Sequence, residues 1–257
     1  ASAFNLKFVD PVGEASTPAD SLIEVDLREE TKAIRFGLRK VTGIDPKAQS
    51  PFWMQRILML AGQRPVNLAT DITNYVMLYL GQPMHAFDAQ KVSGDLVVRN
   101  AQAGEKFETL DHVKRELFAE DVVICDDTGI QSLAGVMGGT TSEISDETTD
   151  VYFEAATWDP ITVARTSRRH KLSSEASRRF ERGVDPAIVE YSLELACELL
   201  VRYGGGRIED ARTLVGAVPS PQVVAIDAAK PSRYAGVDYS NNTIVSRLEE
   251  VGCSVTP

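Results

Sequence analysis

The amino-acid sequence predicts an α/β protein of the α+β type, with a central mixed or antiparallel sheet flanked by helices. From Gly94 to Phe153, apolar and polar residues alternate with period two and are interrupted by short polar breaks. This pattern is typical of strands joined by tight turns. Apolar residues at helical spacing occur before and after this region rather than between successive strands. The clustering of the strands therefore disfavours a doubly wound parallel sheet.

The residues before this cluster predict one strand and two helices. Alternation over 34–39 indicates a strand with one buried face. Ser50–Gly62 begins with a favoured N-cap serine and a first-turn proline, carries apolar residues at helical spacing and stops at a glycine. Asp71–Leu80 predicts a second helix, for which the next glycine is a suitable C-terminal cap. The stretch that follows, GQPMHAFD (81–88), is then expected to be a loop.

The cluster itself predicts a series of short strands. They are expected at Leu96–Val98, Phe107–Leu110, Asp121–Cys125, Ile130–Val136 and Asp150–Ala155. Asp126–Gly129, with the sequence DDTG, is a favourable hairpin turn between two of them. In the last strand, alternation places Tyr152 and Glu154 on one face and the neighbouring apolar residues on the other.

Helices are expected again after the strands. Asp159 and the proline after it predict the start of one helix, which a break at Ser173-Ser174 separates from a short helix ending at Gly183. Asp185 and its proline begin the helix with the clearest pattern, which is expected to run to Tyr203. Acidic side chains at steps of four are expected to form its water-facing side: Glu190, Glu194 and Glu198.

The end of the chain predicts a second, incomplete module. Residues 213–222, which contain two prolines, are expected to link a first domain at residues 1–212 to residues 223–257. This tail predicts a strand and a helix that begins near Asn242. So short a segment is too small to bury a core of its own, and we expect it to be the start of a further domain.

Composition and charge restrict the class of protein. With 43% hydrophobic and 25% charged residues, the chain is typical of a soluble globular protein, and no apolar run approaches the roughly 20 residues that cross a bilayer. The N-terminus has no basic start and no apolar stretch of the kind found in signal peptides. The three cysteines are isolated, which predicts no disulfide framework and favours a reducing, cytoplasmic location. A net charge of −10 argues against a non-specific nucleic-acid binder.

One concentrated basic segment interrupts this acidic composition. Residues 165–182 contain seven arginines and lysines and one histidine. Such a segment either forms a solvated helix face or contacts a phosphate backbone. Its density within an acidic chain favours phosphate contact.

Three further positions are candidates for chemistry, each with a structural alternative. Gly135–Gly139 is either a turn after a strand or a place where the backbone closely approaches a ligand. Glu154 either faces water at a sheet edge or accepts a hydrogen bond inside a pocket, because a buried carboxylate is costly without a partner. His85 lies among apolar residues and is either structural or part of a site. No pair of histidines has metal-ligand spacing, so no metal site is predicted.

Several of these segments together resemble the beta subunit family of the bacterial phenylalanyl-tRNA synthetases. The motifs are long, in the family's order and correctly separated. They are DITNYV at 71–76, LGQPMHAFD at 80–88, GVMGG at 135–139, Glu154 within VYFEAATWDP, and RRHKLSSEASRRFERGVDP at 168–186. The resemblance covers Leu22 to Asp210 as the editing domain of that subunit, and the tail is similar to the start of its next, DNA-binding-like domain.

The resemblance implies hydrolysis of mischarged Tyr-tRNA(Phe). It assigns Glu154 as the acceptor for the tyrosine hydroxyl and Gly138 as a pocket residue whose missing side chain leaves room for the ring. Positions around the scissile ester and the terminal adenosine, expected to be catalytic, are matched by Thr73, Asn74 and His85. Further pocket positions are matched by Ser174 and Ala176. The basic segment would hold the acceptor-end phosphates through Arg168, Arg169, Lys171, Arg178 and Arg179.

The resemblance also implies partners. These are tRNA(Phe) and the synthetase alpha subunit, in a heterotetramer of two alpha and two beta chains. It implies ATP and magnesium for the whole synthetase, and no cofactor for this part of it. No Ser–His–Asp arrangement is apparent, so the hydrolysis is expected to use water without a covalent intermediate. Two other functions stay open: a non-catalytic module that positions the acceptor end of tRNA, and a free-standing trans-editing hydrolase.

Overall fold

A computed structural model describes Lys7 and residues 20–256 of the chain. Residues 1–218 and 219–257 form two compact units, and each is described by itself. Most of the N-terminal sequence, for which no signal peptide is expected, lies outside the described residues.

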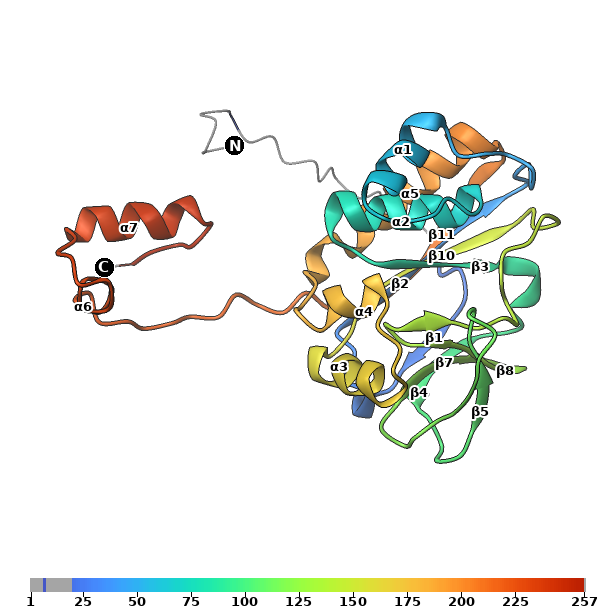
Figure 1. The fold of residues 1–257 in the computed structure, drawn as a ribbon, viewed down its shortest axis with the longest axis horizontal. Helices are drawn as coiled ribbons and strands as arrows, with labels where there is room; N and C mark the ends of the chain where they lie inside the picture. The colour runs from blue at the N-terminus through green and yellow to red at the C-terminus, as the bar shows by residue number, and fades with distance from the viewer. Residues whose placement is uncertain (1–6, 8–19, 257) are drawn as a thin grey trace. The chain divides into compact units, whose positions relative to one another are not determined.

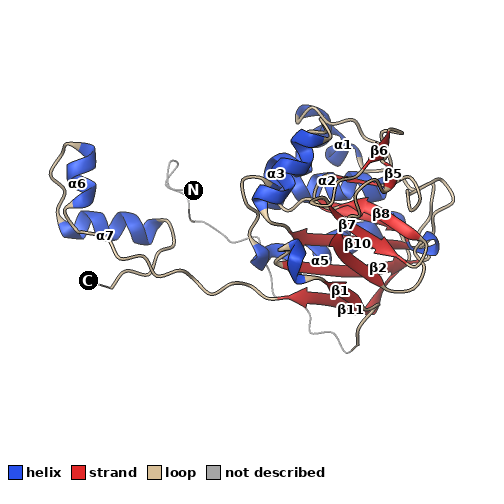
Figure 2. Ribbon diagram, turned by 90° about the horizontal axis from the view of Figure 1, so that it is seen from below, coloured by secondary structure: helices blue, strands red, loops and turns tan. Residues whose placement is uncertain are grey.

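The first unit contains two sheets and a separate hairpin (Figures 1 and 2). Its strands, in chain order, are β1 (Val25–Leu27), β2 (Arg35–Thr42), β3 (Met84–Asp88), β4 (Leu96–Asn100), β5 (Lys106–Glu108), β6 (Lys114–Glu116), β7 (Val122–Asp126), β8 (Gly129–Leu133), β9 (Met137–Gly138), β10 (Val151–Thr157) and β11 (Arg207–Gly216). The five-stranded sheet has the order β1-β4-β7-β8-β9 and is mixed, because β1 pairs with β4 in parallel. The four-stranded sheet, β11-β2-β10-β3, is antiparallel. The fold class predicted from the sequence is therefore confirmed.

Helices cover the four-stranded sheet on one side, while the five-stranded sheet faces its other side (Figure 1). The helices of this unit are α1 (Phe52–Leu60), α2 (Leu68–Leu80), α3 (Pro160–Arg169), α4 (Glu175–Phe180) and α5 (Val189–Gly204). Strand β10 is shared by two apolar cores: Phe153 packs with α1, α2 and α5, whereas Tyr152 and Ala156 pack towards the second sheet. The predicted alternation along this strand is confirmed. Glu154, with the parity of Tyr152, points into the space between the sheets.

Two helix starts differ from the predictions. Helix α2 begins at Leu68 rather than Asp71, because the side chain of Asn67 accepts a hydrogen bond from the Thr70 amide and caps the helix. Asp71 is instead buried, where it accepts hydrogen bonds from the Ser50 hydroxyl and the Val66 amide. Ser50 therefore does not cap α1, whose N-cap position is the proline that follows.

The stretch GQPMHAFD was expected to be a loop, and this expectation is wrong. Gly81 ends α2 in the left-handed conformation, with φ of 83°. The chain then becomes strand β3, which pairs with β10 and places His85 directly opposite Glu154. The strand is short and begins just after a proline, so its local pattern was weak. Its pairing with β10 depends on residues far away in the sequence.

The expected linker and the expected water-facing side of α5 also need correction. Residues 213–216 belong to β11, which pairs with β2, and not to a linker. Glu190 and Glu194 face the sheet rather than water. Three buried arginines of β2 and β11 contact them: Arg35, Arg39 and Arg212. Because the two strands present cations on this face, acidic residues are required on the helix that covers them.

The second unit contains α6 (Lys230–Ala235) and α7 (Asn241–Glu250). Helix α7 starts within one residue of the predicted position, and the side chain of Ser240 caps it by accepting a hydrogen bond from the Thr243 amide. The strand expected before it is not found among the described residues of this unit, none of which is buried. Across the described part of the whole chain, no helix combines the length and the apolarity that a membrane span requires.

Candidate functional site: a cavity between the two sheets

A cavity of about 80 Å³ opens where the two sheets meet helix α4. Since roughly 15 Å³ of such volume holds one water, the space accommodates several waters or a small organic group. Strand β3, the β8–β9 hairpin, β10 and α4 all contribute to its wall. Four residues predicted from the sequence line it together: His85, Gly138, Glu154 and Ala176.

Glu154 supplies the acidic group of this cavity. It lies on β10, where it is paired with Leu38 of β2 on one side and with His85 of β3 on the other. Only 6% of the residue is exposed to solvent. The alternative that it faces water at a sheet edge is thereby excluded. No hydrogen bond to its carboxyl group is found among the described residues. Burial raises the pKa of Glu154 to about 8, so the carboxyl is neutral at pH 7 and both donates and accepts hydrogen bonds.

His85 supplies the second polar group. Its Nε2 atom is buried and has no hydrogen-bond partner in the described structure. The ring packs edge-on against Phe87, with 4.4 Å between the ring centroids. Burial lowers the pKa of His85 to about 4, so the imidazole is neutral at pH 7. Buried polar atoms in native proteins are normally hydrogen-bonded, and an unpaired one beside a cavity indicates a place for a ligand or water.

The backbone of the β8–β9 hairpin lies directly against the His85 imidazole. A Cβ atom built on Gly138 would lie 2.2 Å from His85 Cε1 and 2.5 Å from Nε2. Gly135, at the other end of the hairpin loop, has a positive φ of 68° and no room for a side chain beside Trp158 and Phe180. The cluster forms a turn after strand β8, which is the first of the two alternatives stated for it, and its glycines bring backbone directly against groups that line the cavity.

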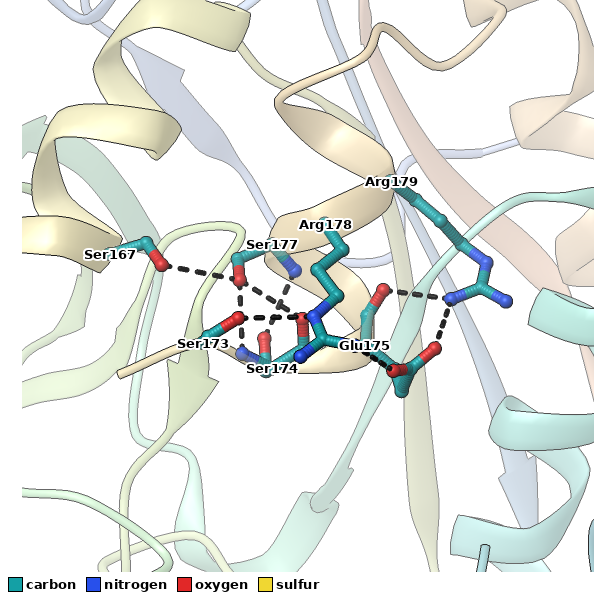
Figure 3. Close-up of polar contacts among 7 residues, drawn as sticks. All are labelled: Ser167, Ser173, Ser174, Glu175, Ser177, Arg178 and Arg179. Carbon is teal, nitrogen blue, oxygen red and sulfur yellow. Dashed lines mark hydrogen bonds and ion pairs between the residues drawn. The ribbon is translucent and has the colours of Figure 1, made fainter. Parts of the chain in front are cut away.

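Ser174 approaches the cavity only indirectly. Its side chain caps α4 by accepting a hydrogen bond from the Ser177 amide (Figure 3). Its hydroxyl donates to the Val136 carbonyl at 2.8 Å. Ser174 itself does not line the cavity, whereas Ala176 and Phe180 of the same helix do.

Thr73 and Asn74 are not brought into the cavity. Both lie on α2, and neither is among the lining residues. The Thr73 hydroxyl donates to the Thr70 carbonyl of its own helix at 2.7 Å.

The basic segment divides into paired and unpaired cations. Arg169 contacts Asp121 and Glu120, and Arg178 and Arg179 contact Glu175 (Figure 3). Arg168 and Lys171 are exposed and have no ion pair among the described residues. The neighbouring His170 also binds the fully buried Asp121, with Nε2 2.6 Å from a carboxylate oxygen. Part of the positive charge that the sequence counts is thus neutralised inside the protein.

Sequence reasoning missed the aromatic wall of the cavity. Trp158 and Phe180 both line it. Trp158 stands four positions after Glu154, an even spacing that continues the cavity-facing side of the strand, and this was the one local signal. Nothing near Phe180 in the sequence indicated that α4 folds onto the β8–β9 hairpin.

A second cavity, of about 300 Å³, lies beside the starts of α1 and α2. Asp71 lines it, but none of the predicted site residues does. Among the described residues, no group of three or more histidine, cysteine, aspartate or glutamate side chains is arranged to hold a metal ion.

Comparison with known proteins connects this site to a family. The B3/4 domain family matches residues 32–205, well over half of the chain. The phenylalanine–tRNA ligase beta subunit of Corynebacterium glutamicum is 73% identical over 264 residues, covering 99% of this chain and 32% of the relative. The beta subunit of Nocardia farcinica is 50% identical over 257 residues, covering 99% of this chain and 31% of the relative. This chain therefore spans about a third of the length of these relatives.

A solved N-terminal fragment of the phenylalanyl-tRNA synthetase beta-subunit from Pyrococcus horikoshii is more distant. It aligns over 93% of this chain and 67% of that chain, with 13% identity and a TM-score of 0.47, which is too low to add to the argument. The bacterial relatives confirm the resemblance seen in the motifs. The chain belongs to the B3/4 domain family, and over almost its whole length it is similar to part of the phenylalanine–tRNA ligase beta subunits.

Proposed function

We propose that this chain is the editing domain of a phenylalanyl-tRNA synthetase beta subunit and that it hydrolyses the ester bond of Tyr-tRNA(Phe). One observation carries the proposal: Glu154 is a buried carboxyl group without a hydrogen-bond partner among the described residues, and it faces the same cavity as His85.

Recognition of tyrosine follows from the protonation state of Glu154. A neutral carboxyl group and a phenol hydroxyl each donate and accept, so they form a hydrogen bond without placing a charge in the cavity. Phenylalanine would leave the buried carboxyl unpaired, which costs about 1–3 kcal/mol. Since about 1.4 kcal/mol is a factor of ten, we expect a roughly ten- to hundredfold preference for the tyrosyl ester.

The reaction adds water across the ester. The water oxygen attacks the carbonyl carbon, the bond to the ribose oxygen breaks, and that oxygen takes up a proton, which leaves tyrosine and uncharged tRNA. With a pKa of about 4, His85 is a weak general base at pH 7. We therefore assign His85 Nε2 to accept a hydrogen bond from the attacking water and so orient it. Thr73 and Asn74 do not line the cavity and receive no role in this step.

The remaining assignments concern the whole synthetase. We assign Arg168 and Lys171, both exposed and unpaired among the described residues, to phosphates near the acceptor end of tRNA(Phe). The alpha subunit, ATP and magnesium belong to the aminoacylation reaction of the longer enzyme and have no site in this part of the proposal.

The test is deacylation of Tyr-tRNA(Phe) and Phe-tRNA(Phe) by the complete synthetase that carries each variant. We expect His85→Ala to lower the rate for both esters. Glu154→Ala should abolish the tyrosine preference, whereas Glu154→Gln, whose amide also donates and accepts, should largely keep it. The proposal is lost if the wild type shows no tyrosine preference. Binding of tRNA without any hydrolysis would instead identify a non-catalytic RNA-binding module.

A further inference from the structure

We propose that Ser174 is a positioning residue, which fixes the β8–β9 hairpin against His85 through the Val136 carbonyl and does not contact the substrate. This inference deepens the proposed function and rests on it for its kinetic readout alone.

A side-chain hydrogen bond links Ser174 of α4 to the backbone of Val136 in the hairpin loop. The Ser174 hydroxyl donates to the Val136 carbonyl at 2.8 Å and accepts from the Ser177 amide at 3.0 Å. Val136 is 4% exposed, so its carbonyl has little access to water. Buried carbonyl groups require a partner, and this hydroxyl provides one across 38 positions of the sequence.

The β8–β9 hairpin loop is tightly packed between α4 and β3. A Cβ atom on Gly135 would lie 2.8 Å from Cδ1 of Trp158, which precedes α3, 2.9 Å from Cγ2 of Val163 in α3, and 3.3 Å from Cδ2 of Phe180 in α4. On the strand side, Gly138 touches the His85 ring. A shift of Val136 therefore reaches the imidazole, because only Met137 separates it from Gly138, whose backbone lies against the ring.

Two nearby serines allow the Ser174–Val136 hydrogen bond to be tested separately from the capping of α4. Ser177 completes the capping box, with its hydroxyl accepting from the Ser174 amide, but no bond joins it to Val136. The Ser173 hydroxyl accepts a hydrogen bond from Arg178 Nε at an exposed position (Figure 3). The two positions supply matched controls one and three residues away.

The decisive measurement is the NMR spectrum of the imidazoles in the 257-residue chain, which has three histidines. We expect Ser174→Ala to shift or broaden the His85 resonance and to leave the exposed His112 unchanged. Ser174→Thr, which keeps the hydroxyl and remains an acceptable N-cap, should restore the wild-type position. Ser173→Ala and Ser177→Ala should leave His85 at its wild-type position.

The kinetic measurement uses the same variants in the complete synthetase. Because a small misplacement of catalytic groups costs up to about a hundredfold in rate, we expect Ser174→Ala to lower kcat for Tyr-tRNA(Phe) about tenfold with little change in KM. Ser174→Thr should recover most of it.

The inference is overturned if Ser174→Ala leaves the His85 resonance unchanged, if Ser174→Thr fails to restore it, or if Ser177→Ala moves it as far as Ser174→Ala does. A wild type without hydrolytic activity would refute the proposed function. The NMR comparison would still decide the role of Ser174.

Discussion

Glu154 and His85 are a pair of buried ionisable groups on neighbouring strands, and burial moves their pKa values in opposite directions. The pKa of the carboxyl rises to about 8 and that of the imidazole falls to about 4. At pH 7 both groups are therefore neutral, and the proton resides on Glu154. Neither group has a counter-ion in the part of the chain that the structure describes. Such a neutral pair suits an uncharged polar ligand group, because a charge in the same space would lack a partner.

Glu154 should make the stability of the protein depend on pH. Its pKa is about 8 in the folded chain but near the ordinary 4.5 when unfolded, so between these values the folded state holds more protons. Its contribution to the free energy of unfolding therefore falls as pH rises, by at most about 1.4 kcal/mol per pH unit. The contribution of His85 has the opposite sign. It increases the free energy of unfolding as the pH rises from about 4 to the ordinary histidine pKa of 6.5, and it is constant above that pH.

We therefore expect the melting temperature of Glu154→Gln to rise relative to wild type as the pH increases from 6.5 to 8, because the amide has no proton to lose. Calorimetry of both proteins across this range measures the difference. A difference that stays constant with pH would show that Glu154 is not titrating there.

Gly138 should not tolerate a side chain while His85 is present. Gly138→Ala places a methyl group within 2.5 Å of the imidazole, and such overpacking typically costs about 1–3 kcal/mol. Because the obstacle is the ring, Gly138→Ala should cost less in a His85→Ala background. A double-mutant cycle by urea denaturation tests this, and additive costs would contradict it.

The elements could be predicted where the local pattern agreed with the tertiary fold. The alternation of β10 and the DDTG turn between β7 and β8 both formed as the sequence indicated. Strand β3 was missed because the proline before it is typical of a loop, and strand β11 because prolines follow it. In both cases the strand that pairs with it is distant in the sequence. The acidic residues of α5 were predicted to face water for a related reason. The pattern of a helix does not reveal that the sheet it covers carries arginines.

The ion-pair cluster beneath α5 should be sensitive to loss of one member. Glu194 lies within 3.6 Å of both Arg39 and Arg212, whose side chains are 6% and 8% exposed. Glu194→Gln leaves these cations under-compensated, so we expect a loss of about 3 kcal/mol in the free energy of unfolding by urea. The exposed Glu198→Gln, on the same helix, is the control and should change it by less than about 0.5 kcal/mol. Equal effects of the two substitutions would contradict the prediction.

At the scale of the whole molecule, the site joins residues that no spacing rule connects. His85, Gly138, Glu154 and Ala176 come from four separate segments. The residues alone marked His85, Glu154 and the glycine cluster as candidates with structural alternatives, and the family resemblance added Ala176 and assigned all four to one pocket. The same resemblance also selected Thr73 and Asn74, which stay outside the cavity. Motif matching therefore identified the region, whereas only the arrangement of the strands distinguished cavity residues from their neighbours.

The first unit should not need residues 219–257 for its stability, because it holds both apolar cores of the described structure. We expect a chain that ends at Val218 to keep the melting temperature of the full 257-residue chain for its main transition. A marked decrease in a thermal scan would mean that residues 219–257 stabilise the first unit.

The internal pairing of Arg169, His170, Arg178 and Arg179 has a consequence for how RNA binding responds to ionic strength. Cations that already have carboxylate partners displace few counterions from a nucleic acid. Between residues 165 and 182, the cations without an ion pair in the described structure are Arg165, Arg168, Lys171 and Arg182. If these four contact a single strand, the logarithm of the binding constant should fall with the logarithm of salt concentration at a slope of about −2.8. Full use of the seven arginines and lysines would give about −4.9. A filter-binding titration across salt concentrations thus measures how many charges this acidic protein leaves available for the proposed tRNA contact.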